Sequence, residues 1–268
     1  MADPVISVES LTVQYGDHRV LDGVSLNIEA GEVMALLGGS GSGKTTMLRH
    51  IIGLERPTSG TVRIRGVDIN RCSPEELKDI RRSMGVAFQE CALFNAMSIE
   101  DNVSLPLHEL TDLADPVIDI MTYMKLVAVG LGQAAKQMPQ ELSGGMKKRA
   151  AVARATALDP EILVFDEPSA GLDPIVAAGL DDLILLLKRA FHITILVVTH
   201  ELASAFRVAD RLAMLYRGSL IAVDTKEAFQ KSTHPRIRQF LDRVADPIES
   251  TAVEDRMREL TGMTGGQK

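Results

Sequence analysis

The chain has 268 residues, of which 46% are hydrophobic and 24% charged, enough to bury the core of one large domain or two modest ones. Its 29 basic and 36 acidic residues give a net charge of -7, which argues against a nucleic-acid binder that relies on a large basic field. The longest largely apolar runs, such as residues 193–198, are much too short to span a bilayer, and no signal peptide is recognisable, so we expect a cytoplasmic protein.

The amino-terminal part of the chain predicts three strands. Two β-rich stretches, 5–15 and 20–28, flank the turn-like pair Gly16-Asp17 and are typical of an antiparallel sheet. The continuous apolar run 33–37 is typical of a strand buried on both faces.

A glycine-rich loop follows this strand directly and leads into a predicted helix over 45–52. Only glycine lets the main chain approach phosphate oxygens closely enough for several N–H groups to converge on them. Lys44 adds a positive charge for the outer phosphates, Thr45 offers a hydroxyl to Mg²⁺, and the helix directs its positive dipole end at the anion. A flexible Gly/Ser linker would not lie between a buried strand and an amphipathic helix. The predicted phosphate loop comprises Gly38, Gly39, Ser40, Gly41, Ser42, Gly43, Lys44, Thr45 and Thr46.

The middle of the chain predicts a change from strands to helices. A helix starts at Ser73-Pro74-Glu75-Glu76, with serine as the cap, and a second buried strand fits residues 84–88. From about residue 95 to 157 the periodicity is helical, which predicts an inserted helical subdomain. Cys72 and Cys91 lack the spacing of a disulfide framework or a zinc site, so we expect them to be packing or surface residues.

The last third of the chain alternates strands and helices again. Strands are predicted at 162–165 and 194–198, and a hairpin at 212–216 and 220–223. Such alternation indicates a parallel sheet with crossover helices. The tail beyond about Asp246 is polar, and we expect it to be mobile. The helix between the two strands has apolar residues on one face, namely Val176, Leu180, Leu183, Ile184, Leu187 and Phe191.

Polar residues at two strand ends predict the chemistry that acts on the phosphates. Asp166 ends an apolar strand, where its carboxylate can hold Mg²⁺ directly or through water. Glu167 follows it and is placed to polarise the water that attacks the γ-phosphate; alone, this acidic pair would read equally well as a surface feature. His200 closes a strand whose end would face the same phosphates. The histidines without such a placement, and without an assigned role, are His18, His50, His108, His192 and His234.

These motifs, in this order, resemble the nucleotide-binding subunit of ATP-binding cassette (ABC) transporters from about residue 5 to 229. The matching residues are Tyr15 for the adenine-stacking aromatic, Gln89 for the glutamine loop, Leu142-Ser143-Gly144-Gly145-Met146 for the signature motif, Ser169-Ala170-Gly171-Leu172-Asp173 for the D-loop and His200 for the switch histidine. The resemblance implies an α/β P-loop NTPase fold with an antiparallel β subdomain, a RecA-like core and the inserted helical subdomain. It places an ABC ATPase domain over residues 1–245 and a carboxy-terminal tail over 246–268.

The resemblance also implies a role for each matching residue. Glu167, His200 and Gln89 would be catalytic, and Thr45, Gln89 and Asp166 would hold Mg²⁺. Tyr15, the phosphate loop and the signature residues Ser143, Gly144 and Gly145 would bind ATP, with Asp173 at the dimer contact. Two copies would pair head to tail, each closing the other's ATP between the phosphate loop and the signature motif.

The signature motif departs from the family pattern at its fifth position, where Met146 replaces the usual glutamine and cannot make its strong hydrogen bonds. This substitution and the segments 138–150, 88–94 and 235–241 resemble the ATPases of Mla/Mce-type lipid transport systems. That implies an ATP hydrolase for phospholipid transport at the cytoplasmic face of the bacterial inner membrane. Its partners would be a membrane permease, an Mce-domain substrate-binding protein and a STAS-domain accessory protein.

Three other functions compete with this interpretation. A cassette ATPase that remodels ribosomes or DNA usually has two cassettes or a long coiled coil, whereas this chain has one cassette and no sustained heptads. A P-loop kinase has no use for the signature helix. An importer of another solute stays open, because the permease selects the substrate.

Overall fold

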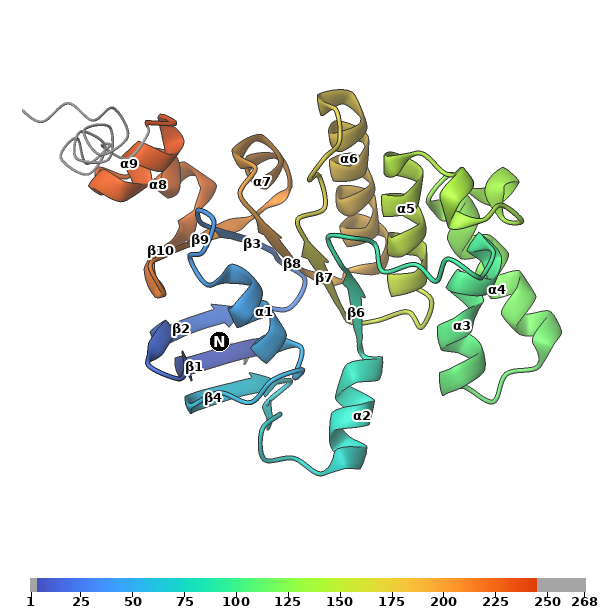
Figure 1. Cartoon of the computed structure of the whole chain (residues 1–268), viewed down its shortest axis with the longest axis horizontal. Coiled ribbons are helices and arrows are strands. Elements are labelled where there is room, and N and C mark those ends of the chain that lie inside the picture. The colour runs from blue at the N-terminus through green and yellow to red at the C-terminus, as the bar shows by residue number, and fades with distance from the viewer. Residues whose placement is uncertain (1–3, 245–268) are drawn as a thin grey trace, which may run out of the picture. The chain divides into compact units, whose positions relative to one another are not determined.

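The computed structural model describes residues 4–244, which fall into two compact units divided between Phe229 and Gln230. The larger unit contains two β-sheets with helices packed on them (Figure 1). Its strands are β1 Ile6–Tyr15, β2 His18–Ile28, β3 Val33–Leu37, β4 Ser59–Ile64, β5 Val67–Asp68, β6 Met84–Ala87, β7 Ile162–Asp166, β8 Thr194–Thr199, β9 Arg211–Tyr216 and β10 Ser219–Thr225.

Helices connect β3 to β4, β5 to β6, β6 to β7, β7 to β8 and β8 to β9. Within the segment 95–157, where we expected an inserted helical subdomain, the structure has α3, α4 and α5 together with two short 3-10 helices. The helices are α1 Lys44–Ile51, α2 Pro74–Arg82, α3 Ile99–Leu110, α4 Asp115–Ala128, η1 Gly132–Ala134, η2 Pro139–Glu141, α5 Gly144–Ala155, α6 Pro174–Phe191, α7 Leu202–Val208, α8 Lys226–Gln230 and α9 Pro235–Leu241.

The first sheet is antiparallel, as predicted, and has the strand order β2-β1-β4-β5. Strands β1 and β2 form its hairpin, with Ile6 opposite Ile28. Strand β4, which was not predicted, pairs with β1 over a long sequence separation. Gly60 of β4 needs glycine, because φ is 91° and an added Cβ would lie 2.4 Å from the Ser10 carbonyl oxygen.

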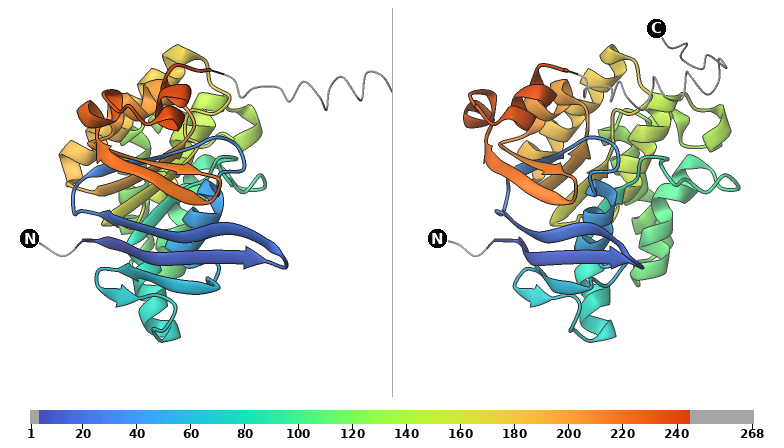
Figure 2. Two further views of the ribbon diagram at one scale, coloured as in Figure 1. Left: turned by 90° about the vertical axis from the view of Figure 1, so that its left-hand side faces the viewer. Right: turned by 60° about the vertical axis from the view of Figure 1, so that its left-hand side comes forward.

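The second sheet has the order β10-β9-β3-β8-β7-β6, in which all neighbours are parallel except β9 and β10. Along β7 and β8 alternate side chains enter two separate hydrophobic clusters, so both strands are buried on both faces. One cluster lies between the two sheets and includes residues of α1, which sits between these layers in Figure 2. This architecture confirms the predicted α/β P-loop NTPase fold.

Two details of the second sheet differ from the prediction. Strand β6 is an edge strand with only Gly85 and Ala87 buried, and it ends before Phe88, which is 37% exposed. The hairpin β9–β10 does more than close the sheet, since β9 also pairs in parallel with β3.

The cap predicted for α2 is present, and α6 is capped as well. Ser73 and Glu76 form a capping box at the start of α2, and Asp173 caps α6 by accepting the N–H groups of Ile175 and Val176, both at 3.0 Å. Phe191 departs from the apolar face predicted for α6, because it ends the helix and is 55% exposed.

The smaller unit is described over residues 230–244 and contains α9, where Arg238 pairs with Asp242 at 2.7 Å. The predicted tail, residues 246–268, lies outside the described residues. Between residues 4 and 244, none of the helices combines the length and apolar character needed to cross a membrane.

Candidate functional site

The carboxyl ends of three parallel strands bring the predicted phosphate site together. Leu37 of β3 lies opposite Thr199 of β8, and Asp166 of β7 lies opposite Val198, so the residues that follow these strands share one sheet edge. In open parallel α/β sheets this edge is where ligands bind. The predicted phosphate loop, Glu167 and His200 therefore meet there.

The phosphate loop runs from β3 into α1, and two of its glycines have no room for a side chain. Gly43 has φ 104°, and an added Cβ would lie 2.6 Å from Leu21 Cδ2. An added Cβ at Gly38 would lie 2.5 Å from both Ser42 Oγ and the Leu215 carbonyl oxygen. Helix α1 begins at Lys44, so its first N–H groups open toward the loop.

Lys44 is buried at the mouth of this loop. Its ammonium donates to the carbonyl oxygens of Gly38 at 2.8 Å and Gly39 at 3.1 Å, and lies 4.0 Å from Glu167 Oε1. Burial lowers the pKa of Lys44, and the carboxylates of Glu167 and Asp166 oppose that shift. A cation held between backbone carbonyls and two acids is well placed to receive a phosphate anion.

Glu167 has a left-handed backbone with φ 47°, which is uncommon for a residue with a side chain. Its N–H donates to Val198 O at 2.8 Å, which fixes it to the end of β8. Its Oε2 faces His200 Nδ1 at 2.9 Å and also accepts from the Thr199 hydroxyl at 3.2 Å. The carboxylate and the imidazole therefore form a pair, as a general base and its partner would.

Asp166 has the properties expected of a Mg²⁺ ligand. It is only 8% exposed, and its Oδ1 has no hydrogen-bond partner among the described residues. Burial raises the pKa of Asp166, and the neighbouring carboxylate of Glu167 adds to the shift. Because Mg²⁺ prefers oxygen ligands, this unpaired oxygen and the exposed Thr45 at the start of α1 fit the ion.

Tyr15, predicted to stack on adenine, lies at the end of β1 and is 49% exposed. Its hydroxyl donates to Glu55, which also accepts from Arg49 of α1 at 3.2 Å. The bond between Tyr15 and Glu55 raises the pKa of the phenol and lowers that of the carboxyl. The ring is thus tied to the helix that follows the phosphate loop.

The signature residues lie at the start of α5, as predicted. Ser143 caps the helix by accepting from Met146 N–H at 3.4 Å. Gly145 has to be glycine, since an added Cβ would lie 2.5 Å from Val176 Cγ1 of α6. Met146 is half-buried, and its side chain packs against the hydrophobic cluster of this region.

Gln89 is exposed after β6 and lines a cavity of about 510 Å³ together with Gly144, Lys148 and Leu172. The Gln89 carbonyl accepts from Lys148 Nζ at 2.6 Å. The same ammonium donates to the carbonyl of Glu167 at 3.1 Å. Lys148 was not predicted as a site residue, because a lysine among the basic residues 147–149 is normally exposed to solvent.

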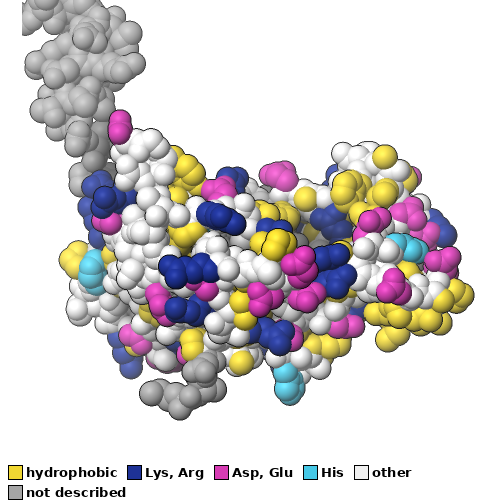
Figure 3. All heavy atoms as spheres, turned by 90° about the horizontal axis from the view of Figure 1, so that it is seen from below, with side chains coloured by type: hydrophobic (Ala, Val, Ile, Leu, Met, Phe, Trp, Pro, Cys, Tyr) yellow, Lys and Arg dark blue, Asp and Glu magenta, His cyan; other side chains and the backbone are white. Residues whose placement is uncertain are grey.

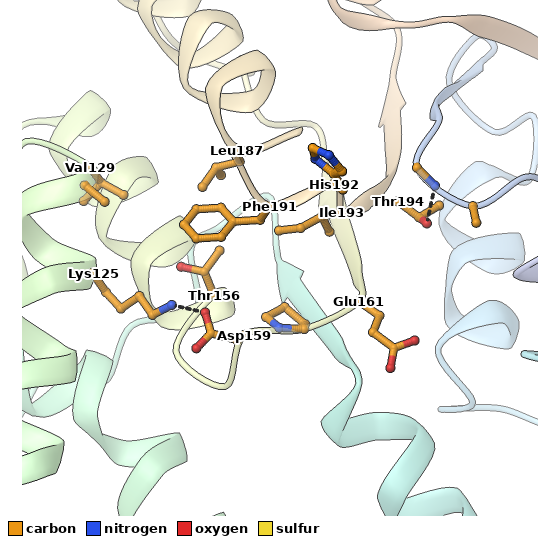
Figure 4. Close-up of a pocket in the computed structure, with 14 residues that line it drawn as sticks. Lys125, Val129, Thr156, Asp159, Glu161, Leu187, Phe191, His192, Ile193 and Thr194 are labelled. Carbon is orange, nitrogen blue, oxygen red and sulfur yellow. Dashed lines mark hydrogen bonds and ion pairs between the residues drawn. The ribbon is translucent and has the colours of Figure 1, made fainter. Parts of the chain in front are cut away.

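A second cavity, of about 560 Å³, lies away from the phosphate loop (Figure 4). It is lined at the amino ends of β7 and β8, the opposite edge of the sheet, by Glu161 and Thr194. Lys125 pairs with Asp159 on its wall and lies 5.7 Å from the centre of the Phe191 ring. This cavity is therefore not part of the phosphate site.

Comparisons with known proteins agree with this geometry. A family model described as ABC transporter matches residues 21–170. The chain is 44% identical over 251 residues to the "Probable ribonucleotide transport ATP-binding protein mkl" of Mycobacterium leprae, covering 93% of this chain and 72% of that protein. It is 41% identical over 242 residues to the "Intermembrane phospholipid transport system ATP-binding protein MlaF" of Escherichia coli K12, covering 90% of each. The dimeric post-hydrolysis state of the ATP-binding cassette MJ0796, bound to ADP and Pi, matches with a TM-score of 0.76 and 31% identity over 82% of this chain and 98% of that one.

Proposed function

Because the chain belongs to the ABC transporter ATP-binding family, we propose that it powers phospholipid transport as a head-to-tail dimer beneath a membrane permease. The chain is an ATP hydrolase of this family. The observation that carries the ATP-hydrolysing part of this proposal is the meeting of Lys44, Asp166, Glu167 and His200 at one sheet edge.

Each of these residues has its own role in ATP hydrolysis. The phosphate loop and Lys44 hold the phosphates of ATP. Glu167 accepts the proton of the attacking water, and His200 orients its carboxylate through the contact of 2.9 Å. The left-handed backbone at Glu167 costs about 1–3 kcal/mol and is held by its surroundings, which is typical of a catalytic position.

Asp166 and Thr45 would hold Mg²⁺, with Gln89 as the third predicted ligand. When bound, the ion neutralises charge on the phosphates. The buried, unpartnered Oδ1 of Asp166 supports this assignment.

The dimer is supported by exposed groups near the signature motif. Ile175, beside the D-loop residue Asp173, is 84% exposed although it is apolar. Ser143 and Gly144 are exposed at the amino end of α5, where a helix can receive an anion. A second copy that covers Ile175 would bring its own phosphate loop to this end.

The phospholipid substrate is supported by the relative named MlaF and by Met146 in the signature motif. The relative named for ribonucleotide transport has the higher identity and supports a second candidate, an ATPase for another solute. By the first proposal the chain sits at the cytoplasmic face of the bacterial inner membrane with a permease, an Mce-domain protein and a STAS-domain protein.

Purification from native membranes in mild detergent tests the two candidates. Mass spectrometry should find a permease, an Mce-domain protein and phospholipid with the chain. A permease with a different binding protein and no phospholipid would support the second candidate, and ribosomes or nucleic acid would contradict both.

A further inference from the structure

Lys148 is a buried cation whose two acceptors are peptide carbonyls rather than carboxylates. Its side chain is 9% exposed and lies on α5, just after the signature motif. Burying an ammonium group is costly, and an apolar residue would fill the same space more favourably. A lysine here is therefore explained by the two hydrogen bonds that it makes.

The two carbonyls belong to neighbouring segments of the phosphate site. Gln89 follows β6 and Glu167 follows β7, and these strands pair in parallel, with Ala87 opposite Phe165. The Glu167 carbonyl also accepts from Ala170 N–H at 3.2 Å. This carbonyl and the Glu167 carboxylate branch from the same Cα, so a pull on the carbonyl that moves this Cα also moves the carboxylate.

Helix α5 also fastens the rest of the loop that contains Gln89. Arg154 donates to the carbonyls of Cys91 at 2.9 Å and Ala92 at 2.7 Å, both of which have left-handed backbones. Helix α5 packs beside β6 (Figure 1). Arg154 thus holds the loop alone, whereas Lys148 holds both the loop and Glu167.

We propose that Lys148 is a positioning residue that couples the loop of Gln89 to the orientation of the catalytic carboxylate of Glu167. This inference rests on the proposed ATPase site and deepens it. A shift of α5 or of the Gln89 loop would stretch one of the two bonds from Lys148 and pull on the Glu167 carbonyl. The signature helix and the hydrolytic site of the same chain are then mechanically linked.

Kinetics of the purified full-length chain test this role. Lys148→Met keeps the aliphatic stem but removes the ammonium, and we expect kcat for ATP to fall about 10-fold or more while KM and the ATP Kd change less than about 2-fold. Lys148→Arg can still donate to both carbonyls and should restore most of kcat. Lys147→Met, which removes the neighbouring ammonium at the same cavity, is the matched control and should behave as wild type.

Hydrogen exchange without nucleotide supplies a second readout. In Lys148→Met the amides of residues 88–92 and 167–171 should exchange faster, while those of α1 keep the wild-type rate. If Lys148→Met does not fold, Lys148→Leu, which also lacks a hydrogen-bond donor, carries the same expectations.

Three outcomes separate this inference from the function on which it rests. Wild-type kcat with unchanged exchange in the variant would overturn the inference alone. Loss of kcat that arginine does not restore, with faster exchange throughout the chain, would show a merely structural role. Absence of ATP binding and hydrolysis in the wild type would overturn the proposed function itself.

Discussion

Glu167 has a left-handed backbone conformation, and both oxygens of its side chain face other residues of the site. Its carboxylate faces Lys44 at 4.0 Å on one oxygen and His200 at 2.9 Å on the other. The carboxylate therefore lies between Lys44, the cation proposed to hold the phosphates, and His200, the residue proposed to orient it. We therefore expect that removing the Glu167 carboxylate stops hydrolysis but leaves ATP binding intact.

Glu167→Gln should lower kcat at least about 100-fold, because the amide keeps the size of the side chain but cannot accept a proton at neutral pH. ATP binding should persist, since Lys44 and the phosphate loop are unchanged. ATPase assays and nucleotide titration of the variant measure both effects. Glu161→Gln, at the opposite end of β7, is the control, and near-full turnover of Glu167→Gln would contradict its role as the base.

Most residues of the site could be predicted because their chemistry is local in the sequence. The loop from Gly38 to Lys44 and the pair after β7 have spacings that only a phosphate site requires. Lys148 could not be predicted, since its burial depends on the folded positions of β6 and β7. The same holds for Glu55, which meets Tyr15 only when β1 and the end of α1 come together.

At the scale of elements, α6 and α7 are joined by a buried polar contact. The Ser204 hydroxyl donates to the carboxylate of Asp181, which is 4% exposed. Burial raises the pKa of Asp181, and the bond from Ser204 and the charge of Arg207 oppose the shift. The folded protein therefore holds the Asp181 proton more tightly than the unfolded chain does.

This contact predicts a pH-dependent effect on stability. Because the pKa of Asp181 is higher in the folded protein than in the unfolded chain, binding of this proton stabilises the folded state. The stabilisation is fully present below the ordinary pKa of aspartate and is lost as the pH rises through the raised pKa. Asp181→Asn has no such proton, so its free energy of unfolding should rise relative to wild type as the pH increases from about 4 to 8. Denaturant unfolding measures this difference. Asp112→Asn, at an exposed position between α3 and α4, is the control. A difference that does not change with pH would contradict this explanation.

The central strands of the second sheet could be predicted from the sequence, whereas β4 could not. Strands β3, β7 and β8 are buried on both faces, and their unbroken apolar runs identify them. Strand β4 contains serine, glycine, threonine and arginine, and is a strand because β1 offers it a partner. Strand β6 lies at a sheet edge, so its apolar pattern is weaker than a central strand's.

At the scale of the whole molecule, helix α4 carries exposed apolar side chains that its own unit leaves uncovered. Hydrophobic side chains gather at the right-hand end of Figure 3, the end at which α3 and α4 lie in Figure 1. Exposed apolar patches of this kind mark interaction sites. This α4 stripe comprises Val117, Ile120, Tyr123, Met124 and Val127, which are 43–62% exposed.

The α4 stripe should be covered by one of the proposed protein partners. Changing Ile120 and Met124 together to glutamate should lower recovery of that partner from native membranes about 10-fold or more, while ATP binding stays unchanged. Leu186→Glu, which alters an exposed apolar residue of α6, is the matched control. Equal recovery of all partners with the variant and the wild type would remove the α4 stripe from the proposed interface.

In the proposed dimer, two copies of the chain complete each other's ATP sites. Lys44→Ala spoils the phosphate loop and Ser143→Glu spoils the signature end of α5, so each variant alone should be inactive. A mixed dimer keeps one intact site, and an equimolar mixture should recover up to about a quarter of wild-type ATPase activity, since half of the dimers are mixed and each has one working site of two. If each variant alone is inactive and the mixture is inactive as well, the head-to-tail account is contradicted.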